Sequence, residues 1–137
     1  MERKPPIIVS SLDLQRIEAL LEKLPPQGFA GRAALEAELL RADVREPEDM
    51  PADVVTMNST VRFTLLESAK SLELTLVYPR DADGSADRIS VFAPIGSALL
   101  GLSVGQQLAW PAAEGKTVTV RVDAICYQPE SAGALHR

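Results

Sequence analysis

The sequence predicts an α+β fold, in which a short antiparallel helical hairpin precedes an antiparallel β-sheet with one short helix. Two observations carry this prediction. Before residue 50, apolar residues recur at the three- and four-residue spacing of amphipathic helices. After residue 50, they alternate with polar residues at the two-residue spacing of strands. We therefore divide the 137 residues at this change of pattern, into 1–50 and 51–137.

The first predicted helix begins near Ser10 or Ser11, either of which can cap it by accepting a main-chain N–H. Asp13 follows in the first turn, where the helix dipole favours a negative charge. Pro25 and Pro26 end the helix, because proline lacks the N–H that a helix interior needs. Its apolar stripe consists of Leu12, Ile17, Leu20, Leu21 and Leu24.

A second amphipathic run carries Leu35, Leu39 and Leu40. Two helices of about 13 residues each make a hairpin roughly 20 Å long. Helices this short are marginal alone, so we expect their apolar stripes to pack on each other. The segment "REPEDMPADVV", residues 45–55, is a connector. Its acids are interpreted as solvated linker and helix-capping residues, with cation binding as the alternative; they are Glu46, Glu48, Asp49 and Asp53.

Five segments after the connector are predicted strands: 59–66, 71–79, 88–94, 105–110 and 116–129. Val61, Phe63 and Leu65 share one face of the first strand by alternation. Phe63, Tyr78 and Trp110 are expected in the core. The last strand is expected to bury one face, which holds Val118, Val120, Val122 and Ala124. Cys126 is interpreted as a small core residue, with a reactive or metal-binding thiol as the alternative.

The segment "APIGSALLGLSVGQQLAW", residues 93–110, is predicted to be a compact turn. Pro94 ends the preceding strand because it cannot donate to the ladder. Residues 97–100 suffice for about one helical turn. Gly101 follows as the residue that adopts a left-handed conformation at a helix end. Val104 and Gly105 then turn the chain into the next strand.

Charge and composition exclude several classes of function. The net charge is −5, which argues against sequence-specific binding of nucleic acid, because phosphate contacts need a basic surface. The single cysteine is compatible with the reducing cytoplasm. No run of about 18 apolar residues is present to span a membrane. The sequence has no Cys/His cluster, no phosphate loop and no catalytic set, so we expect neither cofactor, metal nor enzymatic activity.

The stretch "DRISVFAPIGSALLGLSVGQQLAW" resembles the C-terminal signature of the bacterial transcript-cleavage factors GreA and GreB. That signature reads I-S-x-x-S-P-x-G-x-A-L-L-G-x-x-x-G-D. The segments "MPADVVTMNS", "TLVYP" and "YQPESAG" are similar to the Rnk regulators of nucleoside diphosphate kinase, a branch of the Gre-like transcription factors. Residues that fit the cleavage-factor signature are Ile89, Ser90, Pro94, Gly96, Ala98, Leu99, Leu100, Gly101 and Gly105.

The resemblance implies an FKBP-like α+β domain joined to a short antiparallel coiled coil. It also implies binding to bacterial RNA polymerase at the rim of the secondary channel, which nominates Phe92, Ala93 and Pro94 for the contact. This chain departs from the family there, since Phe-Ala replaces the polar pair that precedes the proline in GreB. An apolar contact would then replace a hydrogen-bonded one. A cytoplasmic monomer is expected.

The same resemblance argues against RNA cleavage. Gre factors hold a magnesium ion with two acids at the hairpin tip, and a carboxylate-bound metal can activate water. The tip here, "KLPPQGFAG", contains no Asp or Glu. Lys23 and Arg32 flank this tip and either meet acidic polymerase surface or are solvated. Phe29 is either an exposed anchor or packs on Leu24 and Leu35.

The sequence therefore predicts a polymerase-binding regulator that competes with cleavage factors without catalysing cleavage. One alternative is a prolyl isomerase, because the implied fold is FKBP-like. That activity uses a pocket lined by several aromatic rings. The other alternative is a free-standing protein-interaction adaptor, for example for a kinase.

Overall fold

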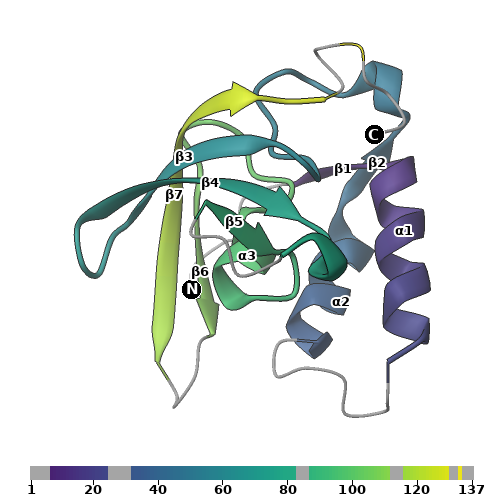
Figure 1. Ribbon diagram of the computed structural model, residues 1–137, viewed down its shortest axis with the longest axis horizontal. Coiled ribbons are helices and arrows are strands. Elements are labelled where there is room, and N and C mark those ends of the chain that lie inside the picture. The colour runs from purple at the N-terminus through teal and green to yellow at the C-terminus, as the bar shows by residue number, and fades with distance from the viewer. Residues whose placement is uncertain (1–6, 25–31, 83–86, 112–115, 130–132, 134–137) are drawn as a thin grey trace.

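The computed structural model describes residues 7–24, 32–82, 87–111, 116–129 and 133 of the chain. Phe29 lies outside these residues. The described chain is a mixed α+β structure, with a helical N-terminal region beside a curled β-sheet (Figure 1). This agrees with the predicted class. Among the described residues, no helix is long and apolar enough to cross a membrane.

The helical region contains α1, Ser11–Glu22, and α2, Arg32–Arg41. Ser10 is the N-cap of α1, and its hydroxyl oxygen accepts the N–H of Asp13 at 3.0 Å. The predicted stripe of α2 is corrected at one position, since the side chain of Leu40 is 89% exposed while Leu35 and Leu39 are buried.

Two short strands frame the helices, and sequence patterns did not predict them. β1, Ile8–Ser10, pairs in parallel with β2, Asp43–Arg45. On its other side, the N–H of Ile8 donates to the carbonyl of Gly101 at 3.1 Å. Three-residue strands are too short to show alternation, so only long-range pairing reveals them. A 3₁₀ turn, Pro47–Asp49, follows β2.

The main sheet has the order β5-β4-β3-β7-β6. All its pairs are antiparallel except β4–β5, which is parallel, so the wholly antiparallel sheet predicted from the sequence is corrected there. After β4 the chain passes through a 3₁₀ turn, Pro79–Asp81. It then forms β5, which runs in the same direction as β4. The strands are β3 Thr60–Leu65, β4 Lys70–Val77, β5 Arg88–Ser90, β6 Gln107–Pro111 and β7 Thr117–Tyr127.

Two bulges in β7 overturn the predicted face of its second half. The register against β3 shifts between Phe63 and Arg62 and again between Val61 and Thr60, which leaves Asp123 and Cys126 as the extra residues. A bulge of one residue shifts the side-chain alternation by one position. Ala124 therefore pairs with the exposed Arg62 on the outer face instead of continuing the inner face. Cys126 is exposed, and its predicted place in the core is wrong.

α3, Pro94–Leu99, lies inside the curve of the sheet (Figure 1). Gly96 allows this position, because a Cβ there would lie 2.0 Å from the carbonyl oxygen of Ser90. Gly101 has φ +85° and follows the C-cap of α3, as predicted. A Cβ at Gly101 would also meet Ile7 at 2.9 Å. These two glycines bring α3 against β5 and β1 respectively.

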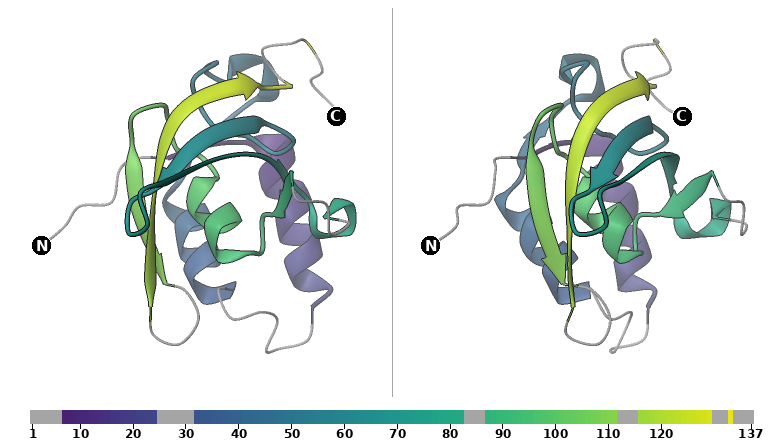
Figure 2. Two further views of the ribbon diagram at one scale, coloured as in Figure 1. Left: turned by 60° about the vertical axis from the view of Figure 1, so that its left-hand side comes forward. Right: turned by 90° about the vertical axis from the view of Figure 1, so that its left-hand side faces the viewer.

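The described core is one continuous cluster that includes both sides of residue 50. Ile17 and Leu35 of the helices belong to the same cluster as Phe63 and Trp110 of the sheet, and all four are almost completely buried. Figure 2 shows α1 and α2 along one side of the sheet from two further directions. The helices therefore bury their apolar stripes with the sheet. The coiled-coil and FKBP-like descriptions remain predictions.

Candidate functional site

Phe92 and Ala93 lie in the loop between β5 and α3, and Pro94 is the first residue of α3. β5 ends at Ser90, earlier than predicted, because the Ser90 side chain accepts the N–H of Phe92 at 3.0 Å and its carbonyl accepts the N–H of Ala93 at 3.0 Å. The carbonyl of Ala93 then accepts the N–H of Ser97 at 2.8 Å and begins α3. These bonds hold the loop in a defined turn.

The loop presents an apolar surface. Phe92 is half-buried and packs against the core, Ala93 is half-buried, and Pro94 is exposed at the first position of α3. Proline is favoured there because its fixed φ suits a helix start and its missing N–H needs no partner. The loop offers carbon surface where the related signature has polar side chains.

Lys23 and Arg32 lie at the loop end of the helical hairpin, on different elements from Phe92–Pro94. Lys23 is the exposed C-cap of α1, and its N–H donates to the carbonyl of Leu20 at 3.2 Å. Arg32 begins α2, and its Nε lies 3.5 Å from Oε2 of Glu36. The two positive charges thus lie where α1 ends and α2 begins, on either side of the acid-free tip in the sequence.

One acid of the connector, Glu46, has a side-chain partner. The Glu46 side chain accepts the hydroxyl of Ser11 at 2.6 Å, which ties the 3₁₀ turn to the start of α1. Glu48 and Asp49 are in the first turn of that 3₁₀ segment. Within the described residues, no group of three or more metal-ligating side chains is found.

Sequence reasoning placed Asp13 at a helix start but missed its second role. Its side chain is buried, and it accepts the N–H of Met57 at 3.1 Å and the hydroxyl of Tyr78 at 3.3 Å. Asp13 thereby joins α1 to the segment before β3 and to the end of β4. No sequence signal could reveal this, because the partners are 44 and 65 residues away.

The environment of Tyr78 follows from this contact. Burial raises the pKa of its hydroxyl strongly, and the negative charge of Asp13 raises the pKa further. Arg16, one turn along α1, opposes the effect through a hydrogen bond to Tyr78 and its positive charge. The hydroxyl is therefore a neutral donor throughout the physiological range.

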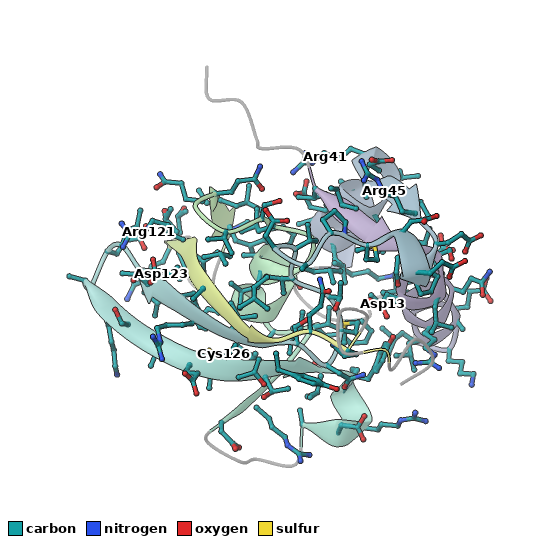
Figure 3. All side chains as sticks on the ribbon, turned by 90° about the horizontal axis from the view of Figure 1, so that it is seen from above. Asp13, Arg41, Arg45, Arg121, Asp123 and Cys126 are labelled. Atoms are coloured by element: carbon teal, nitrogen blue, oxygen red, sulfur yellow. The ribbon has the colours of Figure 1, made fainter. Side chains whose placement is uncertain are left out.

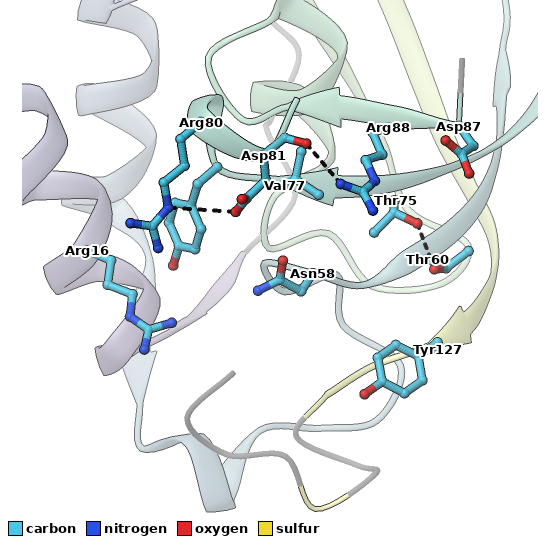
Figure 4. Close-up of a pocket in the computed structure, with 11 residues that line it drawn as sticks. Arg16, Asn58, Thr60, Thr75, Val77, Arg80, Asp81, Asp87, Arg88 and Tyr127 are labelled. Carbon is cyan, nitrogen blue, oxygen red and sulfur yellow. Dashed lines mark hydrogen bonds and ion pairs between the residues drawn. The ribbon is translucent and has the colours of Figure 1, made fainter. Parts of the chain in front are cut away.

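A polar cavity of about 460 Å³ opens beside this contact (Figure 4). Sequence reasoning named Tyr78, as a core residue, and none of the others. The lining comes from α1, β3, β4, β5, the 3₁₀ turn after β4 and the end of β7. The lining residues are Arg16, Asn58, Thr60, Thr75, Val77, Tyr78, Arg80, Asp81, Asp87, Arg88 and Tyr127.

The aromatic residues that could line a prolyl isomerase pocket are buried in the protein core. Phe63 and Trp110 are fully buried in the core, as predicted. Tyr78 is buried and bonded to Asp13. The relatives of this chain, given below, are regulators and transcription factors rather than enzymes.

Two family models match the chain. The model described as "Transcription elongation factor, GreA/GreB, C-term" matches residues 50–127, and the model of the Rnk N-terminus matches residues 5–44. The two matches meet close to residue 50, where the sequence pattern changes from helical to alternating.

Individual relatives agree with the models. The chain is 45% identical over 130 residues to "Regulator of nucleoside diphosphate kinase" of Escherichia coli K12, covering 95% of this chain and 96% of that protein. It is 32% identical over 94 residues to GreA of Thermodesulfovibrio yellowstonii, covering 69% and 59% respectively.

A solved structure is also similar. The transcription elongation factor GreA/GreB of Nitrosomonas europaea has 53% identity and a TM-score of 0.71, with 90% of this chain and 100% of that chain covered. The chain belongs to the GreA/GreB family of transcription factors and carries the N-terminus of its Rnk branch.

Proposed function

We propose that this protein binds RNA polymerase at the rim of the secondary channel, competes there with transcript-cleavage factors, and does not promote cleavage itself. The observation that carries the proposal is the combination of Gre-family membership with a hairpin tip that lacks acids. The tip from Lys23 to Gly31 contains no Asp or Glu. It has no carboxylate to hold the metal that Gre-type cleavage requires.

The length of the hairpin supports the same proposal. α1 has 12 residues and α2 has 10, so the longer helix extends only about 18 Å at 1.5 Å per residue. A hairpin this short is expected to remain near the channel entrance. Occupying the entrance is sufficient for competition, because two factors cannot dock on the same rim.

We assign the rim contact to Phe92, Ala93 and Pro94, with Lys23, Arg32 and Phe29 as further candidates at the hairpin end. The exposed face of Pro94 and the half-buried side chains beside it suit an apolar contact. The cations at the hairpin end suit acidic polymerase surface.

The Escherichia coli relative is named a regulator of nucleoside diphosphate kinase. For this chain we propose that any effect on such a kinase is indirect and acts through transcription in the cytoplasm. A monomer is sufficient for this role, since one hairpin and one docking loop make up the proposed contact.

Purified RNA polymerase core enzyme, used in a pull-down, tests the proposal. We expect retention of the full chain at micromolar concentration, displacement by a GreB-type cleavage factor, and no shortening of RNA in stalled elongation complexes. Absence of binding at micromolar concentration would refute the proposal. Cleavage of the transcript would refute the non-catalytic part.

A substitution at the loop locates the contact. Pro94→Asp places a charge at the first position of α3, where the helix dipole tolerates an acid, so folding should be preserved. We expect at least tenfold weaker polymerase binding. Val104→Asp is the matched control, because Val104 is exposed in a different turn. Equal losses for both variants would contradict the assignment.

A further inference from the structure

The cavity beside Asp13 and Tyr78 is lined by side chains that suit a ligand rather than the core. Arg16 reaches it from α1, Arg80 from the 3₁₀ turn after β4, and Arg88 from β5 (Figure 4). Three guanidinium groups from three elements thus border one cavity. In a chain with a net charge of −5, such a local concentration of arginine marks a site for an anion.

Neighbouring contacts hold two of these arginines in place. Nη1 of Arg88 donates to the carbonyl oxygen of Asp81 at 3.2 Å. Arg16 is hydrogen-bonded to the hydroxyl of Tyr78. Arg80 is 84% exposed and lies 3.9 Å from the carboxylate of Asp81. Among the lining residues that the structure describes, the acids are Asp81 and Asp87, so three arginines face two aspartates.

Uncharged hydrogen-bonding groups complete the lining. Asn58 presents its amide, and the hydroxyls of Thr60 and Thr75 bond to each other at 2.9 Å across β3 and β4. Asn58 adopts φ +67°, and its main-chain N–H donates to the carbonyl of Leu76 at 2.6 Å, which fixes the backbone of Asn58 just before β3. These groups supply donors and acceptors of the kind that surround a phosphate or a sugar.

Besides Tyr78, a second aromatic ring lines the cavity. Tyr127 is the last residue of β7 and is half-buried, and in Figure 4 it lies on the far side of Asn58 from Arg16 and Arg80. Aromatic rings stack with nucleobases, and arginine forks bind phosphate oxygens in pairs. The volume of about 460 Å³ is in the range of small-molecule sites.

We propose that this cavity binds a nucleoside phosphate, with the phosphates at Arg16, Arg80 and Arg88 and the base against Tyr127. The ligand would contact α1 and the sheet together, so its binding would stabilise the junction between the helical hairpin and the sheet. The site is independent of the polymerase contact proposed above. It can be tested, and can fail, without polymerase.

Isothermal titration of the full chain with ADP, inorganic pyrophosphate and adenosine tests the proposal. We expect ADP to bind about tenfold more tightly than pyrophosphate, since stacking of the base adds to the phosphate contacts. Adenosine should show no binding at the same concentration. Equal affinities for ADP and pyrophosphate would overturn the assignment of a nucleoside, and absence of ADP binding at millimolar concentration would overturn the site.

Two variants place the ligand in this cavity. Arg80→Gln combined with Arg88→Gln removes two exposed guanidinium groups, and we expect about 100-fold weaker ADP binding, roughly tenfold for each charge-assisted contact. Tyr127→Leu should weaken binding of ADP about tenfold and leave pyrophosphate unchanged.

The matched control is Arg45→Gln combined with Arg121→Gln. It makes the same change of net charge at two exposed arginines outside the cavity, each paired with an aspartate. We expect unchanged ADP binding, and thermal unfolding confirms that each variant is folded. An equal loss in the control pair and the cavity pair would show non-specific attraction and overturn the proposal.

Discussion

The helical hairpin and the β-sheet are held in place by different means. In the sheet, β3 has hydrogen-bonded neighbours on both edges, and α3 fills the curve against β5, β6 and β7. Within the part of the hairpin that the structure describes, the ladder is limited to the three-residue pair of β1 and β2. It depends on apolar side chains that enter the core of the sheet and on the buried carboxylate of Asp13.

The stability of the hairpin therefore depends on the sheet more than the stability of the sheet depends on the hairpin. The hairpin requires the sheet to bury its apolar stripe, whereas most backbone hydrogen bonds of the sheet are made within the sheet. We therefore keep the division at residue 50 as a proposal about cooperativity: residues 1–50 open first, and residues 51–137 form the more stable unit. The predictions below test this contrast.

The largest effect is expected where α3 meets the sheet. In Gly96→Ala the new methyl group would lie 2.0 Å from the carbonyl oxygen of Ser90, and that oxygen belongs to the backbone. We expect a loss of about 4 kcal/mol in the free energy of unfolding, measured by urea denaturation. Gly105→Ala is the control, since its Cβ meets nothing within 4 Å and only φ +90° is unfavourable. It should cost about 1–2 kcal/mol, and equal losses would contradict the packing argument.

The next effect concerns the attachment of the hairpin. Asp13→Ala leaves the N–H of Met57 and the hydroxyl of Tyr78 without their buried acceptor. We expect a loss of about 3 kcal/mol in the free energy of unfolding. Hydrogen exchange should accelerate in α1 and α2 more than in β3 and β7.

Asp13→Asn is the control for that experiment, because the amide keeps one acceptor oxygen at nearly the same volume. It should cost less than half as much as the alanine variant. An equal acceleration of exchange in the sheet would contradict the unequal dependence of the two regions.

The third effect is the dependence of stability on alkaline pH. Burial and then the charge of Asp13 raise the pKa of Tyr78 above the unfolded value of about 10. Below that pH the hydroxyl is neutral in both states and its contribution is complete. As pH rises above about 10, only the unfolded state loses the proton, and stability falls by about 1.4 kcal/mol per pH unit.

Urea denaturation at pH 9, 10 and 11 measures this slope. Tyr78→Phe should make this slope shallower by the share of one proton, about 1.4 kcal/mol per pH unit. A slope unchanged by the substitution would show that Tyr78 ionises normally in the folded protein.

The smallest effect concerns the outer face of the sheet, where side chains can be changed without disturbing the core. Figure 3 shows Cys126 on β7, and its Sγ lies 3.4 Å from Oε1 of Glu73. The slight burial of this exposed thiol raises its pKa, and the hydrogen bond to Glu73 and the negative charge of Glu73 raise the pKa further. Glu73→Gln should speed labelling by a disulfide reagent about two- to threefold at pH 8. Glu67→Gln, a second exposed glutamate, should leave the rate unchanged, and an equal change would contradict the pairing.

Much of the fold could be predicted from the sequence because it depends on how apolar residues are spaced over a few positions. The α1 stripe, the inner face of β3 and the left-handed Gly101 each follow from spacing or from one residue's conformational preference. The errors occurred where pairing decides the outcome. The bulge at Asp123 turned Ala124 outward, and β5 joined β4 in parallel, because partners distant in sequence set both registers.

Parts of the candidate site could likewise be predicted from the sequence, and other parts could not. The segment from Phe92 to Pro94 was nominated by resemblance and stays a prediction, and the acid-free tip could be read directly from the residues. The cavity bordered by Arg16, Arg80 and Arg88 could not be predicted, since arginines on an exposed helix, a turn and an edge strand carry no local pattern.

By itself, the sequence determined the α+β class, the change of pattern at residue 50, the family signature and the absence of carboxylates at the hairpin tip. These properties depend on residue type and spacing within a few turns or strands. The tertiary structure alone decided that Asp13 joins the hairpin to the sheet, that Cys126 faces outward and that three arginines share one cavity. Each of these depends on which distant backbone segments pair, and local periodicity holds no information about that choice.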